Sequence, residues 1–166
     1  MRVEQATAPC LVLLVAAGLA ASPATQASAE DRSGRAERGK ASFYAETFNG
    51  HRMADGRRYS PGSDAAASKS LPLGTTAKVT NLRTGKSATV QVEDRGPYAR
   101  GRVMDVSPKV AHELDMKKTG VAPVEVKPIA IPEPDGKVKL GSGAAETPPG
   151  QVAEAVRVTK ELSDRR

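Results

Sequence analysis

The chain has 166 residues, of which 39% are hydrophobic but only 3% aromatic, and its formal net charge is +6. This length accommodates one domain with appendages and excludes two domains of ordinary size. The single cysteine excludes a disulfide-stabilised scaffold, and the presence of only two histidines besides it argues against a structural zinc site.

The N-terminal segment has the organisation of an export signal. An apolar run over 11–21 is too short to cross a bilayer as a helix but suits a signal peptide, and small residues follow at 27–29. We therefore expect a signal peptide over 1–29, cleaved before Glu30, and export to the periplasm or cell envelope. Cys10 precedes the apolar run, so we expect neither a lipoprotein nor a transmembrane anchor in the mature chain.

The rest of the chain divides by composition. Residues 30–38 are mostly charged and predict a solvated arm, and residues 39–128 form the expected folded unit. Residues 129–150 are rich in proline and glycine and predict a linker, and 151–166 form a C-terminal tail that could contain a short helix. We thus expect one domain between disordered termini.

Within the folded unit, most segments predict strands. The order is a strand at 41–44, a hairpin whose arms alternate over 77–80 and 88–92 around a glycine-containing turn, and further strands at 102–106 and 121–127. One helix interrupts them, with Ser107 as its N-cap and Pro108 at its first position. This pattern predicts a small, mostly β, closed barrel with one or two short helices.

Two aspartates are the candidate catalytic groups. Asp94 follows a strand directly, at the start of a tight loop, and Asp105 lies between apolar residues of another strand. A carboxyl in an apolar setting is either hydrogen-bonded or desolvated with a raised pKa, and the second state suits a general acid. Structural roles stay open: Asp94 could pair with a cation or cap its own turn, and Asp105 could fix a strand-to-helix corner. His51 and His112 lack a third ligand, so we expect no metal and no cofactor.

At these residues the chain resembles the RlpA (rare lipoprotein A) family of bacterial envelope proteins. The resemblance covers about residues 39–128 and rests on motifs that occur in the family's order: GKASFY at 39–44, FNG at 48–50, LPLGT at 71–75, VTNL at 79–82, GKS at 85–87, DRGPY at 94–98 and GRVMDVS at 101–107.

This resemblance implies a fold and an activity. The expected fold is a six-stranded double-psi β-barrel, and the expected function is that of an endolytic peptidoglycan lytic transglycosylase, a carbon–oxygen lyase. Such an enzyme cleaves the β-1,4 bond between N-acetylmuramic acid and N-acetylglucosamine and leaves a 1,6-anhydro end. The expected partner is then the peptidoglycan glycan strand and not nucleic acid. The positive charge of the chain also favours a polymer of the cell wall as the partner.

The same motifs assign roles to residues. Asp94 matches the family's catalytic aspartate, and Asp105 matches the aspartate that expansin-like relatives place in the glycan groove. The matching motifs also make Tyr44, Arg95 and Tyr98 candidates for substrate binding.

Three positions depart from the family's pattern. Ser68 stands where a second catalytic residue, a histidine, is expected, and a hydroxyl can bind substrate but cannot replace imidazole as a proton carrier. Met53 and Arg57 replace a threonine and a glutamate in the loop expected to face the glycan. Ser68 therefore leaves an alternative open, namely a non-catalytic, expansin-like module that binds peptidoglycan glycan.

Overall fold

The structure is a computed structural model that describes residues 34–165, and the predicted signal peptide lies outside the described residues. The strands are β1 (Glu37–Phe43), β2 (Ala65–Ser68), β3 (Thr76–Asn81), β4 (Ser87–Asp94), β5 (Arg102–Val106), β6 (Ala122–Pro132) and β7 (Val138–Leu140). The α-helices are α1 (Pro108–Glu113) and α2 (Pro149–Asp164), with short 3-10 turns η2 (Glu46–Phe48) and η3 (Ala144–Glu146).

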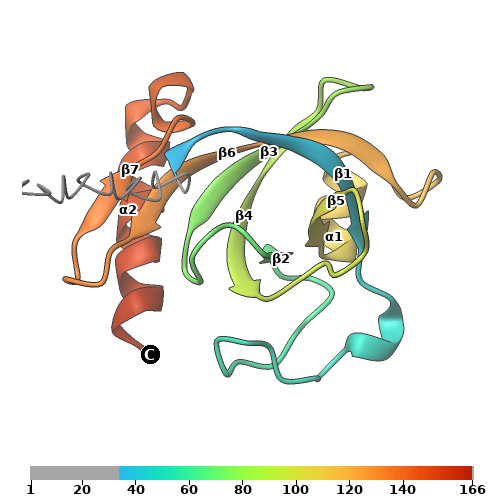
Figure 1. Cartoon of the computed structure of the whole chain (residues 1–166), viewed down its shortest axis with the longest axis horizontal. Coiled ribbons are helices and arrows are strands. Elements are labelled where there is room, and N and C mark those ends of the chain that lie inside the picture. Colours follow the sequence, from blue (N-terminus) through green and yellow to red (C-terminus); the bar gives the residue numbers. More distant parts are fainter. Residues whose placement is uncertain (1–33, 166) are drawn as a thin grey trace, which may run out of the picture. The chain divides into compact units, whose positions relative to one another are not determined.

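Six of these strands close into a barrel. Their order is β1-β5-β2-β4-β3-β6, and β6 pairs back with β1 to complete the ring, while β7 is added at β6 (Figure 1). The pairs β1–β5 and β2–β4 are parallel, and the other neighbours in the ring are antiparallel. The predicted six-stranded barrel is thus confirmed.

The elements with strong local signals form as predicted. The hairpin is β3 and β4, joined in antiparallel register across the turn at 82–86. Helix α1 begins after Ser107, whose hydroxyl accepts a hydrogen bond from the amide of Val110 at 3.2 Å. Ala88, Val90 and Val92 alternate into a core of small and aliphatic side chains, and the buried side of α1 completes that core.

Strand β2 is the element that the sequence pattern did not predict. It consists of three alanines and Ser68, all buried, and it lies between β4 and β5. Alanine has little intrinsic preference for strands, so pairing on both sides imposes this conformation. Its small side chains allow loops to pack closely over it.

The C-terminal segment differs from the predicted linker. Strand β6 continues to Pro132, and residues 138–165 form β7, η3 and α2. A side chain at Gly141 or Gly143 would collide with the carbonyl oxygens of Pro128 and Lys127, since a Cβ there would lie 2.4 and 2.7 Å from them. These glycines therefore serve a close approach of the chain to β6, with amide-to-carbonyl bonds of 3.0 Å to Ile129 and 2.8 Å to Pro128.

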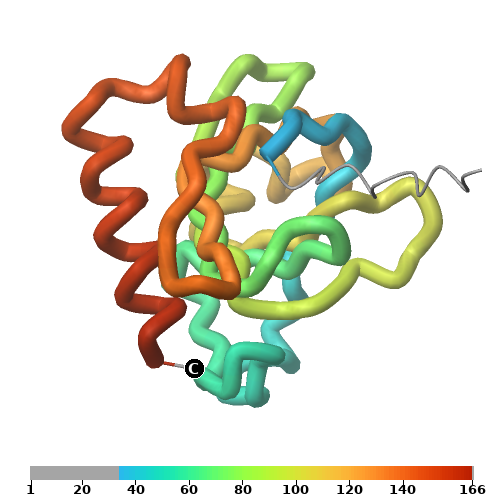
Figure 2. Tube along the Cα trace, turned by 60° about the vertical axis from the view of Figure 1, so that its left-hand side comes forward, coloured from blue at the N-terminus to red at the C-terminus, as the bar shows by residue number. Residues whose placement is uncertain are grey.

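Helix α2 packs on this extended part of the sheet and lies beside β7 (Figure 2). Its buried residues are Ala155 and Thr159. Ala155 packs with Ile129 and Ala130 of β6, and the Thr159 hydroxyl contacts the Thr76 hydroxyl and the carbonyl oxygen of Ala130. The two threonine hydroxyls are 2.8 Å apart in the interface. None of the helices within residues 34–165 has the length and apolar character that crossing a bilayer requires.

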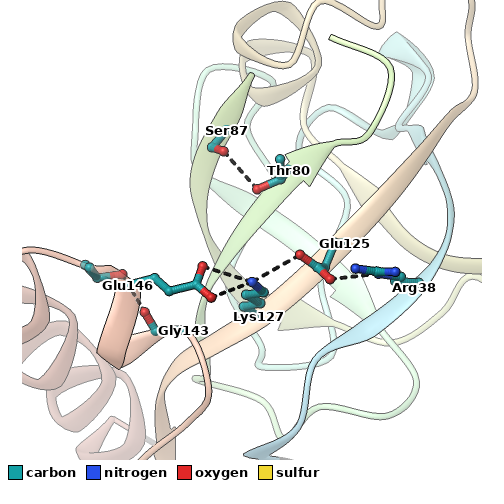
Figure 3. Close-up of polar contacts among 8 residues, drawn as sticks. Arg38, Thr80, Ser87, Glu125, Lys127, Gly143 and Glu146 are labelled. Carbon is teal, nitrogen blue, oxygen red and sulfur yellow. Dashed lines mark hydrogen bonds and ion pairs between the residues drawn. The ribbon is translucent and has the colours of Figure 1, made fainter. Parts of the chain in front are cut away.

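An ion-pair ladder also ties the C-terminal segment to the barrel (Figure 3). Arg38 of β1 lies 2.7 Å from Glu125 of β6, and Lys127 lies 3.2 Å from the same carboxylate. Lys127 also contacts Glu146 of η3 at 2.7 Å. The ladder therefore joins β1, β6 and η3 across the outer surface of the sheet.

Candidate functional site

The two candidate aspartates lie on the same side of the sheet, separated by one strand. Ala67 of β2 is paired with Asp94 of β4 on one side and with Asp105 of β5 on the other. Ser42 of β1 is the next partner of Asp105 in the same row. Two strand spacings place the Cα atoms of the aspartates about 10 Å apart, with Ala67 in the row between them.

A β-bulge turns Asp94 toward this side. In β4, Val90 and Val92 point into the core, and a regular strand would send Asp94 inward as well. The register shifts between Ala66 and Ala67, so that Ala66 faces Val92 but Ala67 faces Asp94. The extra residue in β4 reverses the direction of Asp94, which is a known use of bulges next to active sites.

Three donors hold the carboxylate of Asp94. The amides of Ala54 and Arg95 both donate to Oδ1 at 2.9 Å, and the hydroxyl of Tyr44 donates to Oδ2 at 3.0 Å. The bond from Arg95 makes Asp94 the cap of its own turn, as one of the structural alternatives predicted. Each carboxylate oxygen can accept two hydrogen bonds, so Oδ2 keeps an acceptor position for a ligand.

Tyr44 is a permanent donor in this arrangement. Its burial, and then the negative charge of Asp94, raise the pKa of the Tyr44 phenol well above its ordinary range, and Asp105 adds to the shift. The phenol therefore stays protonated at physiological pH and cannot act as a base.

Asp105 is hydrogen-bonded, which was one of the two states expected for it. Its Oδ1 accepts a hydrogen bond of 2.5 Å from the hydroxyl of Ser42, and its Oδ2 lies 3.1 Å from the Arg102 guanidinium. The Asp105 side chain is 16% exposed, so it borders the surface without being freely solvated.

A buried charge cluster fixes the turn that carries the Ala54 amide. Arg57 contacts Asp55 at 2.7 Å and the buried Glu93 at 2.5 Å, the second as an ion pair without hydrogen-bond alignment. The amide of Asp55 also donates to the carbonyl oxygen of Glu93 at 3.0 Å. Burial raises the pKa of Glu93, and Arg57 opposes that shift. The turn is thus anchored to β4 at the residue next to Asp94.

The other predicted binding residues lie in different settings. Arg95 uses its guanidinium Nη1 to contact the carbonyl oxygens of Ser68 and Leu71 at 3.2 and 2.6 Å, and so it joins its loop to the end of β2. Ser68 is 1% exposed, and its hydroxyl accepts a bond from the amide of Leu71 at 3.2 Å. Tyr98 is 83% exposed. Substrate binding stays a prediction for all three, and for Ser68 the geometry favours a structural role.

Metal binding has no support among residues 34–165, where no three acidic, histidine or cysteine side chains come together as a ligand set. His51 and His112 are both exposed and lie on different elements. Met53, which was expected in a loop facing the glycan, is instead buried against Tyr59 and Ala65.

Sequence patterns missed two contributors to the site. The Ala54 amide is a backbone group in an irregular loop, and no residue type signals where it points. Glu93 has no sequence signal of its own, although its partner Arg57 departs from the pattern of the family. Arg57 lies in a loop and Glu93 in β4, so the pairing depends on the fold.

Comparisons with known proteins agree with this geometry. Residues 36–126 match a double-psi β-barrel family described as "Lytic transglycolase". A "Probable endolytic peptidoglycan transglycosylase RlpA" of Nostoc sp. is 47% identical over 91 residues, which cover 54% of this chain and 24% of that protein. The "Endolytic peptidoglycan transglycosylase RlpA" of Vibrio cholerae is 41% identical over 101 residues, which cover 61% of this chain and 38% of that protein.

The matched region is therefore well under two thirds of the length of either relative. Among solved structures, the apo expansin of Clavibacter michiganensis is similar over 59% of this chain and 52% of that chain, with a TM-score of 0.46 and 22% sequence identity.

Proposed function

The chain belongs to the lytic transglycolase family of double-psi β-barrels, and on that premise we propose that it is an RlpA-like endolytic peptidoglycan transglycosylase. The observation that carries the proposal is the row in which Asp94 and Asp105 flank Ala67 on one side of the sheet. The names of the relatives from Nostoc and Vibrio supply the substrate, the glycan strand of peptidoglycan.

The chemistry needs few protein groups. In lytic cleavage, the C6 hydroxyl of N-acetylmuramic acid attacks its own anomeric carbon, which forms the 1,6-anhydro ring and breaks the bond to the O4 oxygen of the next sugar. The leaving oxygen gains one proton and the C6 hydroxyl loses one, so that no water is consumed. The intramolecular attack replaces the second carboxylate that a glycoside hydrolase requires.

We assign the proton transfers to Asp94. Its Oδ2 has a remaining acceptor position, and the donors on both oxygens hold the carboxyl in one orientation. The protonated carboxyl delivers its proton to the leaving oxygen, and the carboxylate then accepts the proton of the C6 hydroxyl. Tyr44 maintains the orientation throughout because it stays protonated. Asp105 supports the reaction as a second negative charge near the anomeric carbon.

A second candidate function is a non-catalytic module that binds peptidoglycan glycan. Ser68 favours it, because the residue stands where the family has a catalytic histidine and its hydroxyl is buried. The enzyme proposal accommodates this difference, since Asp94 can carry both proton transfers when they occur in sequence. The two candidates differ in a measurable product.

The proposal extends to location. Relatives named as peptidoglycan transglycosylases act on the cell wall, so this chain is proposed to be exported to the periplasm or cell envelope. The predicted signal peptide at 1–29 is consistent with such a location.

Mass spectrometry of soluble products tests the enzyme proposal. The protein is incubated with purified peptidoglycan stripped of stem peptides, and fragments with 1,6-anhydro ends are expected. Asp94→Asn is expected to abolish them and Asp105→Asn to reduce them, whereas Asp135→Asn, in the exposed turn between β6 and β7, serves as the matched control. If the wild-type protein releases no fragments but sediments with the glycan, the binding module is the correct function.

A further inference from the structure

The aromatic side chains of this protein gather around Asp94 instead of filling its core. The chain has two phenylalanines, three tyrosines and no tryptophan. Three of these five lie together beside Asp94, namely Tyr44, whose hydroxyl donates to that carboxylate, and Phe48 and Tyr59, whose rings lie against the ring of Tyr44. The main core is built from aliphatic side chains and methionines, with Phe43 packed at its edge. The rings at the site are therefore not needed to build the main core, and we consider a role in ligand binding for them.

These three rings and the imidazole of His51 are in contact in the order Tyr59, Tyr44, Phe48, His51. Tyr44 donates its hydroxyl to Asp94, and its ring centroid lies 4.6 Å from that of Tyr59 and 5.6 Å from that of Phe48. The Phe48 ring in turn lies 5.7 Å from the His51 ring, with an edge-to-face orientation. Exposure increases in this order, from 3% at Tyr59 to 46% at Phe48.

Phe48 is one of the large hydrophobic residues that the described part of the chain leaves exposed. Tyr98 is the other aromatic residue among them, and Leu82, Val121 and Leu140 are aliphatic. Phe48 keeps nearly half its surface in water although it contacts a residue that is hydrogen-bonded to Asp94. An exposed apolar surface next to convergent polar groups is typical of a ligand-binding groove.

We propose that Phe48, with His51 at its side, forms a sugar-binding subsite on which one pyranose ring of the glycan strand stacks. A β-1,4-linked N-acetylhexosamine presents axial C–H groups on its face and hydroxyl and acetamido groups around its rim. The Phe48 ring offers an apolar surface for the face, and the imidazole of His51 offers a hydrogen bond to the rim. This subsite rests on the proposed function for its ligand class, and it holds the strand next to Asp94.

The two histidines of the chain give a direct readout, because His51 lies at the subsite and His112 lies on α1. In untagged protein, the imidazole proton resonances are followed by NMR during titration with peptide-free peptidoglycan strands or with chitin oligosaccharides. Both ligands contain N-acetylglucosamine, and only the first contains N-acetylmuramic acid. We expect the His51 resonances to shift and those of His112 to stay in place.

Variants test the ring itself. Phe48→Ala and Phe48→Leu are each expected to weaken glycan binding about fivefold, as for one lost aromatic contact, whereas Phe48→Trp retains it. Leu82→Ala is the matched control, because Leu82 is 47% exposed at the far end of the β3–β4 hairpin. Thermal unfolding of each variant verifies that it is folded, and Phe48→Leu keeps an apolar side chain where alanine would perturb the loop.

The outcomes separate the subsite from the enzymatic activity. Loss of binding in the Phe48 variants supports the subsite even if the wild-type protein releases no anhydro products. Unchanged binding in Phe48→Ala and Phe48→Leu overturns the subsite even if products are released, and so does an unshifted His51 at saturation with both ligands. A response to peptidoglycan strands alone assigns the ring to N-acetylmuramic acid, and a response to both assigns it to the shared N-acetylhexosamine chemistry.

Discussion

Replacing Arg57 with methionine removes the cation that lies against two acidic side chains, Asp55 and Glu93, near Asp94. In the Arg57→Met variant, the buried Glu93 loses its ion-pair partner, and the turn that presents the Ala54 amide to Asp94 keeps only its backbone contacts with β4. Removing one partner of a fully buried pair costs about 3–5 kcal/mol. The Arg57 side chain is 38% exposed, so water screens the pair and we expect about 2 kcal/mol at pH 7.

The loss of stability in Arg57→Met should depend on pH, because the pKa of Glu93 in the folded protein is already raised above its ordinary value of 4.5. A raised folded-state pKa stabilises the folded protein fully below the unfolded pKa, and this contribution is lost as pH rises through the folded pKa. Without Arg57, the pKa of Glu93 rises further and the loss on ionisation grows. The Arg57→Met variant should therefore be closer to wild type at pH 4 than at pH 7.

Thermal unfolding at the two pH values measures this difference. For a chain of this size, about 2 kcal/mol corresponds to a decrease in Tm of about 6 °C at pH 7. Adding Glu93→Gln to Arg57→Met should restore most of the loss at pH 7, since a neutral amide needs no cation. An equal loss at both pH values, or no recovery in the double variant, would refute the argument that Glu93 is a buried charge neutralised by Arg57.

Two further substitutions separate catalytic orientation from structural support. Tyr44→Phe removes one hydrogen-bond donor from Asp94 and should lower kcat for glycan cleavage, because that bond orients the carboxyl group. Glycan binding should stay within about twofold of wild type, because most of the glycan strand does not contact this hydroxyl. An unchanged kcat in product-release assays would contradict this role. Ser68→Ala leaves a buried amide unpaired and should cost about 1 kcal/mol, seen as a lower Tm; a normal Tm with weakened glycan binding would instead make Ser68 a substrate contact.

The sequence predicted those parts of the fold whose signals are local. Alternating residues around a glycine turn indicated the hairpin of β3 and β4, and Ser107 with Pro108 marked the start of α1. Strand β2 gave no such signal, because three alanines and a serine become a strand only when β4 and β5 pair with them. The same strand separates the two aspartates, so their spatial relation could not be inferred from the residues alone.

Proline and glycine misled the prediction at the C-terminal side for a physical reason. Their abundance is typical of flexible linkers, but glycine also permits two backbone segments to touch. Gly141 and Gly143 serve the second purpose, and the contact they permit brings η3 and α2 onto β6. The bulge that turns Asp94 outward likewise depends on register and has no sequence signature.

The packing of α2 has a practical consequence for where this protein can be divided. The segment matched by the family ends at residue 126, in the middle of β6. A gene fragment cut there would encode a barrel whose sixth strand lacks Ile129 and Ala130, and the hydroxyl of Thr76 would lose Thr159. A unit that keeps these contacts therefore extends past residue 126 and includes helix α2.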